Sequence, residues 1–181
     1  MAVMPRASYD WTVDDLHQLP DDGLQYELLD GMLLVTPAPI PLHQGVLGEL
    51  YKTIDRSCPS HLKTFVAPLD WQPDHRTSLQ PDVLVVARAD IGQRNITEPL
   101  VLAVEVLSPS TRRKDRVLKF SKYADAGVTS YWIVDPTAPS VDAYQLVGGK
   151  YVDAGHATGS EPLTVREPFP ITVVPAELVD L

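Results

Sequence analysis

Apolar positions recur with two different periods along the chain, which predicts helices interleaved with β-strands. The segment from residue 41 to about residue 56 has apolar side chains at helical spacing, so it should form an amphipathic helix with one face on a sheet. Residues 81–87 (PDVLVVA) and 100–107 (LVLAVEVL) are short, Val-rich apolar runs, which are typical of central strands. The helix positions expected to face the sheet are Val46, Leu47, Leu50 and Ile54.

Cap and turn residues mark two elements near the N-terminus. Thr12, with Asp15 three residues later, favours the N-cap of a short helix of about two turns that Pro20 ends. The dipeptide Asp30-Gly31 lies between YELL and MLLVT, two apolar runs. It suits the tight turn of a β-hairpin, because both central residues of such a turn need positive φ.

The second half of the chain contains one more helix and several strands. A helix is expected from about residue 111 to residue 126, because Gly127 is well suited to the position just after a helix. Residues 88–99 are polar and should form a connection. Further strands are expected in LKTFVA (62–67) and SYWIVD (130–135), and a terminal hairpin from Val141 to Val152.

The order helix, hairpin, helix, strands, helix, strands favours a mixed α/β (α+β) fold. We expect a mixed sheet flanked by at least two helices, with β-hairpins at the N-terminal and C-terminal ends. The chain has 181 residues, of which 44% are hydrophobic and 22% charged. This composition is ordinary for a globular domain, so residues 1–181 are expected to form one domain.

Composition excludes several classes of protein. No stretch approaches the ~20 apolar residues of a membrane span, and the first residues lack the apolar core of a secretory signal, so a cytoplasmic protein without a membrane partner is expected. Cys58 is the single cysteine, which leaves no internal disulfide and no cysteine-based zinc site. The net charge of −9 argues against a protein that coats nucleic acid through bulk electrostatics. Any phosphate binding must therefore be local.

Positive charge is concentrated in one short segment. Six of the 15 Lys and Arg residues lie within eleven positions, with Asp115 as the only acid among them. A charge run of this kind is most often a solvated helix face. Its position directly after the strand with Glu105 favours a second interpretation, contact with a phosphate backbone. The six residues are Arg112, Arg113, Lys114, Arg116, Lys119 and Lys122.

Two carboxylates belong to the predicted central strands. Asp82 opens one strand and Glu105 lies near the end of the next, so they meet at one sheet edge if the strands are antiparallel neighbours. A carboxylate in an apolar run needs a metal ion, a basic partner or a shifted pKa. Asp82, Glu105 and the main-chain carbonyl of Val106 would form the incomplete oxygen shell that Mg²⁺ or Mn²⁺ accepts. Equally, Asp82 could be a turn residue after Pro81, and Glu105 could pair with a nearby base.

Several blocks of sequence resemble a known family. Pro81-Asp82 followed by Glu105-Val106-Leu107 resembles the PD-(D/E)XK nuclease signature, with Leu107 where a lysine is usual. The match to the Uma-two family, a large bacterial group described as putative restriction endonucleases on a PD-(D/E)XK core, runs from about Tyr26 to Tyr151. It rests on YELLDG, the helix with His43, PDVLVV, LAVEVLSPST, the series Asp115, Lys119 and Tyr123, GVTSYWIVDP and VDAYQLVGGKYV.

The resemblance implies a restriction-endonuclease-like core and assigns roles to single residues. It suggests that Lys119, on the helix after the acidic strand, replaces the missing lysine at position 107, with Lys122 as the competing candidate. An α-helical wheel raises an objection, since Val117 and Phe120 centre on the side opposite the lysines. The lysine face would then point toward solvent.

Two further residues are candidates through the family pattern. Glu27 would add an upstream acid to the catalytic site, although it could also lie on the outward face of the first hairpin. His43 would contact phosphate or a base, although a histidine at a helix start is more often a surface residue.

The sequence therefore predicts a metal-dependent endonuclease acting on nucleic acid, preferably DNA. Asp82 and Glu105 would hold Mg²⁺ or Mn²⁺, and Lys119 would orient or deprotonate the attacking water. The alternative is a catalytically degenerate nuclease-fold module that binds nucleic acid or a protein partner, which Leu107 and the acidic net charge favour. Cleavage of both strands would need a homodimer, because one site cuts one strand.

Overall fold

A computed structural model describes residues 10–108 and 114–180 of the chain. The helices are α1 (Val13–Leu16), α2 (Pro41–Ser57), α3 (Phe120–Asp125) and α4 (Pro175–Leu178), with a 3₁₀ turn at Arg88–Asp90 and a π-helical segment at Lys114–Lys119. The strands are β1 (Gln25–Leu29), β2 (Met32–Thr36), β3 (Leu62–Val66), β4 (Trp71–Asp74), β5 (Thr77–Leu79), β6 (Val83–Ala87), β7 (Leu102–Val106), β8 (Ser130–Asp135), β9 (Ser140–Val147), β10 (Lys150–Thr158), β11 (Leu163–Val165) and β12 (Ile171–Val173).

A mixed six-stranded sheet with the order β10-β9-β8-β7-β6-β3 is the centre of the fold. The strands β7 and β8 are parallel, and the chain between them passes through α3, whereas β6 and β7 are antiparallel with Val83 opposite Val104. This register confirms the prediction that the strands after Asp82 and around Glu105 are antiparallel neighbours. The fold is the mixed α/β fold expected from the sequence.

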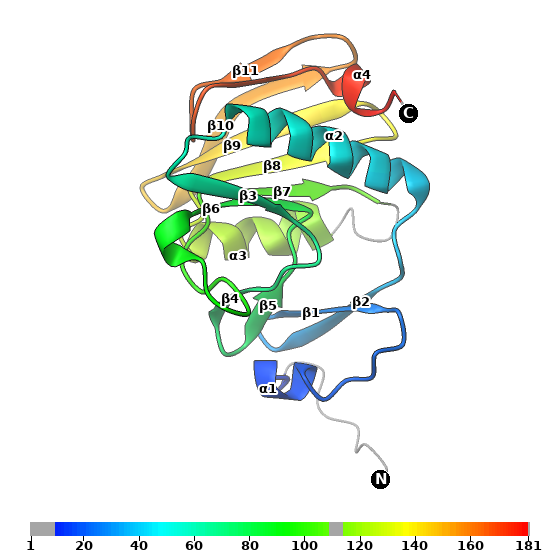
Figure 1. Cartoon of the computed structure of the whole chain (residues 1–181), viewed down its shortest axis with the longest axis vertical. Coiled ribbons are helices and arrows are strands. Elements are labelled where there is room, and N and C mark those ends of the chain that lie inside the picture. Colours follow the sequence, from blue (N-terminus) through cyan, green and yellow to red (C-terminus); the bar gives the residue numbers. More distant parts are fainter. Residues whose placement is uncertain (1–9, 109–113, 181) are drawn as a thin grey trace.

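Helices cover the two faces of this sheet (Figure 1). The four predicted residues of α2 are buried on one face, together with Val83, Val104 and Trp132. Tyr123 of α3 packs on the other face beside Leu84 and Ala103. Apolar residues of β6 and β7 alternate between these two clusters, and both faces of the central strands are therefore buried.

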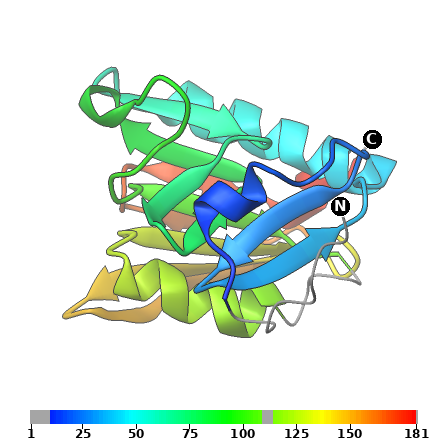
Figure 2. The same ribbon diagram turned by 90° about the horizontal axis from the view of Figure 1, so that it is seen from below.

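A smaller sheet with the order β2-β1-β5-β4 lies beside the central sheet, with α1 next to it (Figures 1 and 2). The predicted hairpin β1–β2 turns at Asp30 and Gly31, both with positive φ. Residues 80–82 join β5 of the small sheet directly to β6 of the central sheet. The two sheets therefore meet at Asp82.

Three predicted elements differ from the observed ones in extent. The α1 helix has one turn instead of two, although Thr12 and Asp15 form the expected capping box. The predicted terminal hairpin exists as β9–β10 but is followed by β11, β12 and α4. The start predicted for the next helix, at about residue 111, lies outside the described residues, and the helix ends where expected, with Gly127 at φ +80°.

Among residues 10–108 and 114–180, none of the helices has the length and apolar character that crossing a lipid bilayer needs.

Candidate functional site

Lys119 lies between two carboxylates that come from different sheets. Its Nζ atom donates hydrogen bonds to Oε1 of Glu27 in β1, at 3.0 Å, and to Oε1 of Glu105 in β7, at 3.1 Å. All three side chains are at most 6% exposed. Removing one partner from such a buried group costs several kcal/mol, because the remaining charges stay desolvated. The structure thus brings together three of the residues predicted from the sequence.

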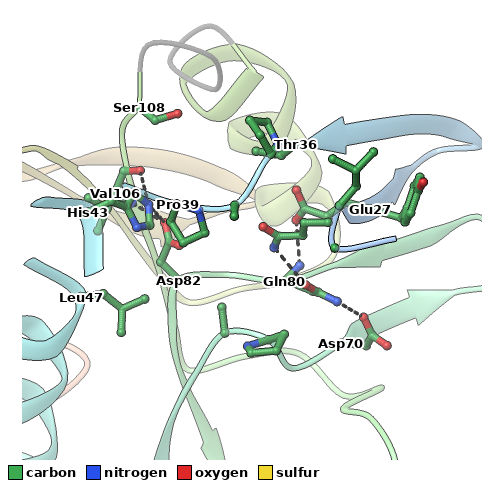
Figure 3. A pocket seen from close by; sticks show the side chains of 18 of the residues that line it. Glu27, Thr36, Pro39, His43, Leu47, Asp70, Gln80, Asp82, Val106 and Ser108 are labelled. Atoms are coloured by element: carbon green, nitrogen blue, oxygen red, sulfur yellow. Dashed lines mark hydrogen bonds and ion pairs between the residues drawn. The ribbon is translucent and has the colours of Figure 1, made fainter. Parts of the chain in front are cut away.

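The alternative position considered for Glu27, on the outward face of the hairpin, is wrong, because its side chain is buried. Besides Lys119, Glu27 Oε1 accepts a hydrogen bond from the backbone N–H of Gln80 at 2.8 Å. The Gln80 side chain in turn donates to Asp70 and accepts from Gln25 (Figure 3). Gln80 and Asp70 were not predicted, because the pairings of β1 with β5 and of β4 with β5 bring them close to Glu27.

The solvent-facing position that the helical wheel gave to Lys119 is also wrong. Lys119 is 4% exposed, whereas Val117 is 58% exposed. The reason is the π-helical segment Lys114–Lys119, in which hydrogen bonds run from i to i+5. Each residue then turns by a smaller angle about the axis than in an α-helix, so an α-helical wheel assigns its side chains to the wrong faces.

Tyr123 holds the Glu105 carboxylate from a third direction. Its hydroxyl donates to Oε1 of Glu105 at 2.6 Å, and its ring stacks on Trp71 with centroids 5.3 Å apart. Burial raises the pKa of Tyr123 well above its usual value, and the negative charge of Glu105 raises it further. The hydroxyl is therefore a hydrogen-bond donor at neutral pH, and Tyr123 positions Glu105.

The raised pKa of Tyr123 predicts a loss of stability at high pH. Its phenol stays neutral in the folded protein, whereas an unfolded tyrosine ionises near pH 10. The contribution of the neutral Tyr123 phenol to the free energy of unfolding is complete below that pH. Above it, the contribution falls by up to about 1.4 kcal/mol per pH unit. Urea unfolding followed by tryptophan fluorescence between pH 8 and pH 11 should give a shallower decline for Tyr123→Phe. An identical slope for the variant and the wild type would contradict this.

Asp82 lies against the peptide that joins Glu105 to Val106. Its Oδ2 atom accepts the backbone N–H of Val106 at 2.7 Å and lies 3.4 Å from Nε2 of His43. The same His43 nitrogen is 3.1 Å from the carbonyl oxygen of Val106, so its hydrogen-bonding role depends on its tautomer. Figure 3 shows these three residues together on one side of the site and Glu27 with Gln80 on the other. His43 therefore contacts the predicted metal-binding residues from the start of α2.

The oxygen atoms at this position suit a small divalent cation. Two carboxylates and one carbonyl, from Asp82, Glu105 and Val106, are hard ligands, and Mg²⁺ typically takes one or two carboxylates and keeps water for the rest. The carbonyl oxygen has two lone pairs, so contact with His43 leaves one for a cation. Within the described ranges, no group of three or more His, Cys, Asp and Glu side chains is placed so that it could hold a metal ion by itself. The residues fit an ion that brings its own waters.

Lys122 does not reach this group. Its Nζ atom donates to Asp30 and to Asp74, each at 2.7 Å. Burial alone would lower the pKa of Lys122, but the hydrogen bonds to Asp30 and Asp74 outweigh it and raise the pKa. The lysine that lies beside Glu105 is Lys119, one turn before Lys122 along the helix.

Four predicted nucleic-acid contacts cannot be placed. Arg112 and Arg113 lie outside the described residues, and the side chains of Lys114 and Arg116 are likewise outside what the structure describes.

A cavity of about 700 Å³ opens onto the buried group. Its floor includes Glu27, Asp82, Glu105 and Lys119. Its walls come from α1, the loop before β1, residues 36–40 and the start of α2. Pockets of this size hold small molecules or single groups of a larger substrate. The predicted acids and Lys119 thus share one cavity.

Comparisons with known proteins assign the chain to a family and a fold. A profile of the Uma2 family, described as "Putative restriction endonuclease", matches residues 13–177. Among curated proteins the comparison found no match. A solved structure with the same fold is that of a putative nuclease belonging to DUF820 from Anabaena variabilis ATCC 29413. The two chains are 19% identical with a TM-score of 0.71, over 93% of this chain and 97% of that one. The fold and the span of the family match together show that this chain belongs to the Uma2 family of restriction-endonuclease-like proteins.

Proposed function

We propose that this protein is a metal-dependent endonuclease that hydrolyses phosphodiester bonds in DNA. The observation that carries the proposal is the buried Glu27–Lys119–Glu105 group beside Asp82, on the floor of one cavity. A fold alone does not define an activity, so the argument rests on the chemistry of these side chains.

Charge at the site favours a divalent cation. Glu27, Asp82 and Glu105 carry three formal negative charges and Lys119 carries one positive charge, so these four side chains together carry a formal charge of −2. Acids gathered at low exposure favour a cation beside them. A divalent cation would balance this charge, whereas a phosphate diester by itself would make the site more negative.

Each residue has a role in this proposal. Asp82, Glu105 and the Val106 carbonyl would hold Mg²⁺ or Mn²⁺, which when bound supplies Lewis acidity at a phosphoryl oxygen and makes a water more acidic. The Lys119 ammonium orients the attacking water and offers a positive charge to the negative charge that develops on the phosphoryl oxygens. Glu27 holds Lys119 in place from the opposite side.

The alternative is a degenerate module that binds nucleic acid or a protein partner without cutting, and it is favoured by Leu107. This residue is 2% exposed and packs in the apolar cluster with Tyr123, so position 107 offers no cation. The enzyme is supported by the ammonium of Lys119, which lies 3.1 Å from Glu105. It can supply the positive charge that a lysine at position 107 would otherwise provide.

A plasmid assay with a matched control tests the proposal. Supercoiled plasmid should be nicked with Mg²⁺ or Mn²⁺ and remain intact with a chelator. Asp82→Asn should abolish nicking, whereas Asp125→Asn, at an exposed acid on α3, should not. Absence of nicking with several metals would count against the enzyme. DNA binding that survives Asp82→Asn would then favour the degenerate module.

Substitution of Lys122 separates the two lysine candidates. Lys122→Met should leave the nicking rate within about twofold, since its partners Asp30 and Asp74 lie outside the lining of the cavity. The melting temperature should fall by only a few degrees, because partly exposed ion pairs contribute about 0.2–1 kcal/mol each. If Lys122→Met lost as much nicking as Lys119→Met, the proposal that Lys119 and not Lys122 is the catalytic lysine would be wrong.

Two further parts of the proposal concern the substrate. Arg112, Arg113, Lys114 and Arg116 would contact the phosphate backbone, which positions DNA without reading its sequence. Cleavage of both strands would require two sites, and therefore a homodimer. Sedimentation of the purified protein with and without DNA measures this.

A further inference from the structure

We propose that the cavity takes one unpaired nucleotide, so the preferred substrate is single-stranded or locally unpaired DNA and not intact duplex. This inference rests on the proposed function and specifies its substrate class. Three features of the described residues support it: the burial of the reacting groups, the apolar side chains that line the same cavity, and the sign of the charges that line it.

The reacting side chains line the cavity and are buried under its surface. Glu27, Glu105 and Lys119 are each at most 5% exposed, and all three belong to the lining of the cavity of about 700 Å³. A substrate phosphate that contacts Lys119 must therefore enter the cavity and cannot stay on the outer surface of the protein. The phosphates of an intact duplex lie on a broad double-stranded rod, whereas an unpaired nucleotide can enter a pocket alone.

Two large, exposed apolar side chains line the cavity and form what is here called the apolar wall. They are Leu24 and Ile40, which are 44% and 56% exposed. Tyr26 also lines the cavity, with its hydroxyl bonded to Asp22 at 2.7 Å. Apolar and aromatic walls suit an unstacked base, because every base has a flat face that packs on such groups.

The charges of the described lining disfavour a second phosphate inside the cavity. Among the described residues that line it, Lys119 is the only lysine or arginine, whereas Asp21, Asp70, Glu27, Asp82 and Glu105 are acids. This lining can accept one phosphate next to Lys119 and a bound cation, and its acids repel any further phosphate that enters the cavity.

Labelled oligonucleotides of one sequence test the substrate class. A single strand, a blunt duplex and a duplex with a central unpaired bubble are incubated with the full-length protein and Mn²⁺. We expect the single strand and the bubble to be cut at least about tenfold faster than the duplex, at unpaired positions, given the cost of unpairing a base. Equal or faster cutting of the blunt duplex would overturn the inference and leave the nuclease function intact.

Binding provides an independent readout. Fluorescence anisotropy with Ca²⁺ in place of Mn²⁺ should show tighter binding of the single strand than of the duplex. If no oligonucleotide is cut, the proposed nuclease function fails, and anisotropy alone then decides the inference. Equal affinity for the two forms, or tighter binding of the duplex, would overturn it.

A matched pair of variants tests the apolar wall. Leu24→Ser combined with Ile40→Ser should raise the KM for the single strand, and its Kd in Ca²⁺, by about tenfold. Val147→Ser combined with Val152→Ser removes two apolar side chains of similar exposure, 57% and 46%, on the β9–β10 hairpin outside the cavity. The second pair should behave like the wild type. If both double variants had the same KM and Kd for the single strand, the apolar wall would have no role in binding it.

Discussion

Replacement of Glu105 by Gln is expected to reduce metal-dependent cleavage of DNA by at least about a hundredfold, the effect of removing one strong electrostatic contact from an active site. The amide keeps the shape of the carboxylate and can still accept from Tyr123, but it loses the charge that holds a cation. Initial rates of plasmid nicking under saturating Mn²⁺ measure the effect.

The same variant has a second readout that does not depend on cleavage. Mn²⁺ should raise the melting temperature of the wild-type protein, because the ion binds only the folded state, and this rise should disappear in Glu105→Gln. Glu177→Gln, at an exposed position of α4, is the control that should keep both the rise and the cleavage. Cleavage by Glu105→Gln at the rate of this control would exclude Glu105 from the site.

Replacement of Lys119 by Met is expected to cause the largest loss of stability. Glu27 and Glu105 would remain buried without the ammonium that lies about equally close to both. Breaking a buried ion pair in this way costs about 3–5 kcal/mol. For a chain of this size the melting temperature should fall by roughly 6–20 °C. Differential scanning calorimetry measures the change.

Divalent cations distinguish a catalytic Lys119 from a purely structural one. Mn²⁺ should recover part of the lost stability in Lys119→Met, because it supplies positive charge beside Glu105. Nicking should stay reduced by about a hundredfold at a temperature where the variant is folded. A folded Lys119→Met protein with normal nicking would leave Lys119 only a structural role.

Elements with strong local signals could be predicted from the sequence. The four buried positions of α2 follow from spacing alone, and the hairpin turn follows from Asp30 and Gly31. The Val-rich strands predicted the positions of Asp82 and Glu105, because apolar runs of that kind occur at the centre of sheets. Of these elements, the two Val-rich strands are neighbours within the central sheet, and the hairpin belongs to the small sheet.

The short elements and the surroundings of the acids could not be predicted. β5 and β12 have three residues each, too few to show a period. The π-helical turn before Lys119 has no recognised sequence signal and reverses the face on which that lysine lies. The role of Tyr123 could be predicted only in part. The residue belongs to the family series, but that series does not indicate the hydrogen bond from its hydroxyl to Glu105.

The contact between Lys119 and Glu27 links the two sheets, since Glu27 belongs to the small sheet and Glu105 to the central one. A cation that takes over Glu105 would compete with the ammonium and so change the attachment of the β1–β2 hairpin. Amide hydrogen exchange in that hairpin should therefore respond to divalent ions. Occupancy of the metal site would then be detectable at backbone amides that never touch the ion.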